Sequence, residues 1–134
     1  FIMTVQYSEA VRNAMLDAIE STIGTGAKLK FFSGAVPANC AAADPAGLLA
    51  TITCPSDWMN AASGGTKTLL GTWSVAASGS GTAICYRIYD SAGTTCGEQG
   101  TVGTSGTDIV LDNNVMAATQ VVTITAKTIT AGNA

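Results

Sequence analysis

Between residues 8 and 23, apolar side chains recur every three or four positions, which is the period of an amphipathic helix. Ser8 can cap this helix by accepting hydrogen bonds from the free amides of its first turn, and one of the glycines that follow can end it. The charged residues Arg12, Asp17 and Glu20 lie largely off the apolar stripe. We therefore expect the stripe to pack on the rest of the protein. It consists of Val11, Met15, Ile19 and Ile23.

After residue 26 the period changes to two, which is typical of half-buried strands. Glycine, proline, asparagine and aspartate separate the alternating segments and mark turns. One helix followed by about seven or eight short strands predicts a mainly-β fold, a jelly-roll-like β-sandwich with one N-terminal α-helix. At 134 residues the chain is expected to hold one domain, residues 8–134, preceded by an arm of residues 1–7. The expected strands are 27–32, 48–54, 68–75, 82–90, 94–100, 106–113 and 119–130.

The last expected strand contains a break in its alternation. Val122, Ile124 and Ala126 fall on one side, and the threonines between them fall on the other. The next apolar residue is Ile129, although an unbroken alternation would place an inward side chain at position 128. We therefore predict a β-bulge or bend at Lys127–Thr128.

Charge is scarce in this sequence. Hydrophobic residues make up 47% of the chain, charged residues only 11%, and the net charge is −3. The six lysines and arginines are spread singly, so the sequence has no basic patch of the kind that binds nucleic acid. No apolar run has the length of a membrane span, and no membrane partner is expected. Because few charges give little self-repulsion, we expect association into a dimer or higher oligomer.

The chain has four cysteines, Cys40, Cys54, Cys85 and Cys96, and no histidine. The cysteines form no C-x-x-C pair, so neither a zinc site nor another metal or cofactor is expected. An even number leaves two disulfides open if the protein is secreted. Free thiols are the favoured prediction, since cysteines are frequently buried as small apolar residues and stay reduced in a cytoplasm.

Catalytic motifs are missing as well. Without histidine, neither a Ser-His-Asp nor a Cys-His arrangement can form within this chain. Asp57, Asp90, Asp108 and Asp112 stand at expected turns or strand ends, where aspartate typically bonds nearby backbone amides. The segment 108–114, DIVLDNN, is rich in oxygens but lacks the ligand spacing of a calcium loop. We therefore expect that the protein is not an enzyme.

Aromatic and terminal residues are the candidates for intermolecular contacts. Trp73 is in phase with apolar strand residues and is expected in the core, whereas Trp58 stands in a loop. A loop tryptophan is either a lid on the end of the sandwich or a contact anchor, and with a tyrosine it can also form a sugar-stacking platform. The N-terminal arm is too apolar for a free tail. The candidate intermolecular contacts are therefore Phe1, Ile2, Met3, Val5, Tyr7 and Trp58.

Six fragments in a fixed order carry a resemblance to a known family. They are YSEAVRNAMLDAIESTIG, LKFFSGAVP, LLATITCPSDW, GTAICYRIYDSAGTT, GTDIVLDNN and QVVTIT. Together they resemble small virion proteins of tailed bacteriophages, including head cement or decoration proteins, over nearly the whole chain. Many of those proteins carry a glycine just before the final glutamine, where this chain has Thr119.

The resemblance implies a function that the residues alone do not give. It implies a jelly-roll-like virion protein, without catalytic residues, on the outer surface of the capsid. Its partner would be the major capsid protein, whose capsomers it would cement together, and it would be assembled in the cytoplasm of a bacterial host. Two alternatives remain: another virion component, of the tail or connector, and a carbohydrate-binding β-sandwich module.

Overall fold

The computed structural model describes residues 5–134, which begin with an extended segment and one helix, α1 (Glu9–Ile23). Ser8 caps the helix by accepting from the amide of Val11, as predicted. The helix ends at Gly24, whose φ of 93° is a conformation that glycine adopts readily and other residues avoid.

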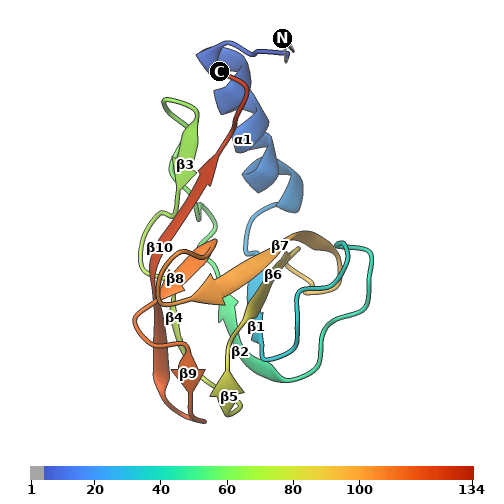
Figure 1. Cartoon of the computed structure of the whole chain (residues 1–134), viewed down its shortest axis with the longest axis vertical. Coiled ribbons are helices and arrows are strands. Elements are labelled where there is room, and N and C mark those ends of the chain that lie inside the picture. The colour runs from blue at the N-terminus through green and yellow to red at the C-terminus, as the bar shows by residue number, and fades with distance from the viewer. Residues whose placement is uncertain (1–4) are drawn as a thin grey trace.

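Short strands make up most of the remaining regular structure of the described chain (Figure 1). They are β1 (Lys28–Phe32), β2 (Leu48–Thr53), β3 (Thr66–Thr68), β4 (Ser74–Ala76), β5 (Gly81–Thr82), β6 (Cys85–Tyr89), β7 (Cys96–Gly103), β8 (Ile109–Leu111), β9 (Val115–Met116) and β10 (Val121–Thr130).

Most of these strands join one curled sheet in the order β2-β1-β6-β7-β8-β10-β3, and β4 also pairs with β10. The pairs are antiparallel except for β7 with β8, which are parallel. The strands β5 and β9 form a small separate pair at the end of the molecule opposite to α1 (Figure 1). The predicted mainly-β, sandwich-like fold with one helix near the N-terminus is confirmed.

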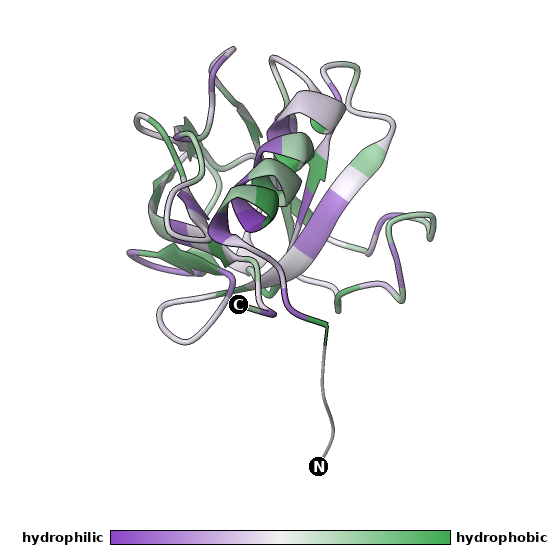
Figure 2. Cartoon of the chain, turned by 90° about the horizontal axis from the view of Figure 1, so that it is seen from above, coloured by the Kyte–Doolittle hydropathy of each residue, from purple (hydrophilic) through white to green (hydrophobic). Residues whose placement is uncertain are grey.

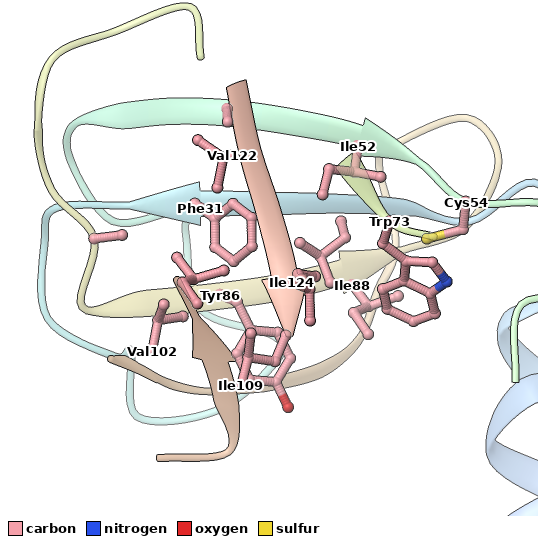
Figure 3. Packing of buried hydrophobic residues seen from close by; sticks show 14 of the residues in the cluster. Phe31, Ile52, Cys54, Trp73, Tyr86, Ile88, Val102, Ile109, Val122 and Ile124 are labelled. Atoms are coloured by element: carbon pink, nitrogen blue, oxygen red, sulfur yellow. The ribbon is translucent and has the colours of Figure 1, made fainter. Parts of the chain in front are cut away.

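The core lies inside this curled sheet, between β1, β2 and β6 on one side and β8 and β10 on the other. Phe31, Ile52 and Ile88 point from the first group of strands toward Val122 and Ile124 of β10 (Figure 3). All five side chains are almost fully buried. Burying each aliphatic or aromatic side chain contributes on the order of 1.5–3 kcal/mol, so this cluster stabilises the fold substantially.

Two strand predictions need correction. The predicted strand 68–75 is two strands, β3 and β4, because the chain turns between them at Gly71, where φ is +78°. The alternation predicted that only one face of β6 is buried, but all residues of this strand are buried. The second face is covered by the connection between β1 and β2, whose carbonyl oxygens accept hydrogen bonds from Arg87.

The break in the alternation of β10 is real, but the prediction placed it at the wrong residues. The pairing with β8 shifts register between Ile124 and Ala126, which places the irregularity at Thr125 and not at Lys127–Thr128. Beyond the shift, Lys127 and Ile129 turn inward in place of Ala126 and Thr128. The bulge therefore explains why an apolar residue stands at position 129.

Candidate interaction surface

The described part of the arm runs alongside the other end of the chain. The Tyr7 amide donates to the carbonyl oxygen of Asn133 at 2.6 Å, and Gln6 donates to that of Ala134 at 3.0 Å. Figure 1 shows the start of the described chain and the C-terminus at the helix end of the molecule. The side chain of Val5 is 67% exposed and that of Tyr7 is also exposed, and their role in intermolecular contacts stays a prediction. The other arm candidates, Phe1, Ile2 and Met3, lie outside the described residues.

Helix α1 does not dock through its predicted apolar stripe. Val11 and Met15 are 44% and 51% exposed, and only Ile23 of the stripe packs against the core cluster. The fully buried helix residue is Leu16, which the stripe did not include. Figure 2 looks down onto the helix and shows hydrophobic and hydrophilic positions interspersed along its ribbon.

The helix docks instead through its polar face, which the sequence pattern assigned to solvent. Asp17 accepts hydrogen bonds from the Ala62 amide at 2.9 Å and from Lys67 Nζ at 2.7 Å. One oxygen of Glu20 accepts from the amides of Trp58 and Met59 at 2.9 and 3.0 Å. These carboxylates bind amides of the connection between β2 and β3, which would otherwise lack partners.

A buried lysine of β3 completes this polar docking. Lys67 is only 2% exposed, and its Nζ lies 2.7 Å from Asp17 and 3.2 Å from Glu20. Burial alone would lower the pKa of Lys67, but the two carboxylates outweigh it and raise the pKa. The pKa of Asp17 is lowered, first by its hydrogen bond with Lys67 and then by the Ala62 amide. The site is therefore a fixed ion pair that holds the helix in place.

Trp58 is a core residue of the helix end and not a contact residue. Its side chain is 0% exposed, its indole donates to the Gly24 carbonyl oxygen at 3.0 Å, and its ring lies 5.8 Å from that of Trp73. Trp58 therefore covers the end of the sandwich as a lid, which is one of the roles that the sequence left open, and it is not a contact anchor. The sugar-stacking platform needs an exposed Trp58, so this residue cannot provide one.

A second buried ion pair lies under β10. The bulge turns Lys127 inward, where its Nζ contacts the carboxylate of Glu98 and lies 3.1 Å from the hydroxyl oxygen of Tyr86. Tyr86 donates to the same carboxylate. Burial, and then the nearby Glu98 charge, raise the pKa of Tyr86, so its phenol stays protonated. Lys127 and Tyr86 share one oxygen of Glu98, whereas the other oxygen, Oε2, is buried without a hydrogen-bond partner. The sequence positions of these three residues gave no sign of the cluster.

The predicted role of aspartates at turns is confirmed for three of them. Asp90 accepts from the Thr94 and Thr95 amides, Asp108 from the Thr101 amide, and Asp112 from the amide that follows it. Within residues 5–134, no three histidine, cysteine, aspartate or glutamate side chains are grouped so that they could hold a metal ion. In the same part of the chain, no helix is long and apolar enough to cross a membrane.

Exposed apolar side chains lie at both ends of the molecule, and Val36, Leu48 and Ile84 are exposed as well. Val5, Tyr7, Val11 and Met15 lie at the helix end, which we call the helix-end surface. Val115 and Val121, 56% and 61% exposed, lie on β9 and at the start of β10 at the opposite end, which we call the far-end surface (Figure 1). No protein-family model, curated protein or solved structure matches this chain.

Proposed function

We propose that this protein is a structural component of a tailed-bacteriophage head, which binds the outer surface of the capsid and cements neighbouring capsomers. The observation that carries the proposal is the pair of exposed apolar surfaces at opposite ends of a chain that is only 11% charged. Exposed apolar groups that cluster on a surface commonly mark interfaces. A protein that bridges two capsomers needs two such surfaces, and the ordered sequence fragments described above point to the same class of virion protein.

The docking of the helix supports this proposal. Its polar face binds the amides of residues 58–65 and Lys67, so the helix is held in place while Val11 and Met15 of its apolar face stay exposed. Val11 and Met15 are one helical turn apart and are neighbours on that free face. An apolar helix face that the fold leaves uncovered is a natural contact for a partner surface.

The mechanism would be two-point binding. Once one end of the protein is bound, the other end meets the adjacent capsomer at high effective concentration, so retention rises by roughly 10²–10⁴-fold over one contact. Since the protein would bind only the assembled shell, it would also stabilise that state by mass action. Because the contact residues are apolar, binding should depend little on salt.

The test is a binding assay with shells from which this protein has been stripped. Purified protein is added back at low and high salt, and the bound fraction is measured by sedimentation. We expect binding at both salt concentrations, and at least a tenfold weaker apparent affinity for Met15→Asp and for Val121→Asp. Val36→Asp, which adds the same charge at an exposed valine between β1 and β2, is the matched control and should bind normally.

Three results would contradict the proposal. One is failure to bind shells at either salt concentration, and another is equal binding by all three variants. The third is assembly of the purified protein into rings or tubes without a shell, which would favour a tail or connector component.

A further inference from the structure

Two of the four cysteines come together from distant parts of the chain. Cys40 lies in the connection between β1 and β2, and Cys96 is the first residue of β7. The Cys40 side chain is near enough to Cys96 to raise the pKa of its thiol, which donates to the Glu98 carbonyl oxygen at 3.3 Å. Both residues line a cavity of about 600 Å³, together with Arg87 and Tyr89 of β6. All four cysteines are free thiols in this structure, as the sequence favoured.

The backbone at both cysteines is fixed by the surrounding structure. Arg87 is buried and donates to the carbonyl oxygens of Cys40 at 2.8 Å and Ala42 at 3.0 Å, and to the carboxylate of Asp44 at 2.8 Å. Cys96 is paired with Tyr89 in the β6–β7 ladder. A ladder and an arginine therefore fix the backbone of both cysteines at the same cavity, and their placement does not depend on a free loop.

Access separates this pair from the other two cysteines. Cys40 and Cys96 are half-buried, whereas Cys54 and Cys85 are buried. Burial raises the pKa of the Cys54 thiol to about 12, which leaves very little of the reactive thiolate. Burial, and then the contact with Cys40, raise the pKa of Cys96 to about 11, so reaction of the pair should be slow at neutral pH and faster at higher pH.

We propose that Cys40 and Cys96 are a latent disulfide site, which closes when the folded protein meets a small-molecule disulfide. The thiolate of one cysteine attacks the reagent, its S–S bond breaks, and one reagent thiolate leaves. The second cysteine thiolate then attacks the protein sulfur of the mixed disulfide and expels the other reagent thiolate. Two protein thiols are thereby oxidised to one disulfide, and the reagent is reduced to two thiols.

The bond would tie the β1–β2 connection to the start of β7. A crosslink between residues so far apart in sequence limits the freedom of the unfolded chain, so the folded state gains stability. We expect a rise in the melting temperature of roughly 5–15 °C. This inference does not depend on the proposed capsid function, because it concerns the isolated chain.

The experiment treats the folded, reduced protein with oxidised glutathione at mildly alkaline pH, followed by alkylation of the remaining thiols in denaturant. We expect a mass loss of about 2 Da before alkylation, two alkylated thiols and the higher melting temperature, all reversed by dithiothreitol. Cleavage after lysine and arginine and before aspartate places the four cysteines on separate peptides. The linked peptides should be 31–43, with Cys40, and 90–107, with Cys96.

Single variants make the assignment specific. Cys40→Ser and Cys96→Ser should each abolish the crosslink and the rise in melting temperature while keeping the circular dichroism spectrum of the original protein. The inference is overturned if four thiols remain, if only glutathione adducts form, or if the crosslink contains Cys54 or Cys85. It is also overturned if either serine variant still gains the thermal shift.

Discussion

Replacement of Lys67 by methionine tests how helix α1 is held. Methionine keeps most of the apolar stem of the lysine but removes the ammonium group. That group makes three contacts: with Asp17 at 2.7 Å, with Glu20 at 3.2 Å and with the carbonyl oxygen of Asn60 at 2.9 Å. The substitution therefore removes the ion pair and leaves the packing of the stem nearly unchanged.

The expected loss can be estimated from these contacts. Removal of one member of a fully buried ion pair costs about 3–5 kcal/mol. Here Asp17 is half-exposed and regains water, which lowers the cost, whereas Glu20 remains mostly buried and loses the cation with which it pairs. We expect a decrease in the free energy of unfolding of about 3 kcal/mol and a fall in melting temperature of about 10 °C. A domain with a stability of about 5–15 kcal/mol would still fold.

Urea denaturation followed by circular dichroism measures this loss, with Met15→Lys as the matched control. Met15 is 51% exposed on the opposite side of the helix, so its replacement should change the free energy of unfolding by less than about 0.5 kcal/mol. The reasoning fails if Lys67→Met is neutral while Met15→Lys loses several kcal/mol. That result would mean that the helix docks through the apolar stripe that the sequence pattern predicted.

Three further predictions follow from single residues. The pKa values of Asp17 and Glu20 are lowered in the fold, so the stability that these carboxylates give is present above about pH 4.5 and is lost as the pH falls through their folded-state pKa values. The urea concentration at the unfolding midpoint should therefore decrease as the pH is lowered below about 4.5. The decrease should be smaller in Lys67→Met. Thr119 has a φ of +73°, which strains a β-branched residue, so Thr119→Gly should raise the free energy of unfolding by roughly 1 kcal/mol, and a loss would contradict this account. A Cβ at Gly100 would lie 2.6 Å from a carboxylate oxygen of Asp108 and 2.7 Å from the ring of Tyr86. Gly100→Ala should therefore lower the urea midpoint by an amount equivalent to about 2–3 kcal/mol. Gly132→Ala is the control: its Cβ meets no atom within 4 Å, so the midpoint should not change.

The fold was largely predictable because local patterns and the tertiary structure agree for most of the sheet. Alternation gave the strands at β1, β2, β6, β8 and β10, and the serine cap gave the start of the helix. The break in phase at Ile129 correctly indicated a bulge. The position of the bulge could not be predicted. A bulge at Thr125 turns Lys127 inward, whereas a bulge at Lys127–Thr128 would turn Ala126 inward, and a lysine is not expected at an inward position.

The candidate surface was predictable only in part. The apolar segment before the helix cap made Val5 and Tyr7 contact candidates, and both are exposed in the structure. The prediction of which helix face docks was wrong, because an amphipathic pattern is interpreted on the assumption that apolar residues are buried. In this fold the amides of residues 58–65 need hydrogen-bond acceptors, and Asp17, Glu20 and their polar neighbours supply them. These amides lie far from the helix in the sequence, so the periodicity of the helix cannot reveal that they need acceptors. Burial of Trp58 likewise depends on a carbonyl oxygen at the end of the helix.

The most direct test of the capsid proposal is the temperature at which shells rupture. Shells that carry the protein, shells stripped of it and stripped shells restored with purified protein are heated in parallel at low and high salt. We expect stripped shells to rupture at a lower temperature, and restoration to recover the original temperature at both salt concentrations. Restoration with Met15→Asp should recover it only in part, because one of the two contacts is weakened. If stripped and restored shells rupture at the same temperature, the protein does not cement the capsid.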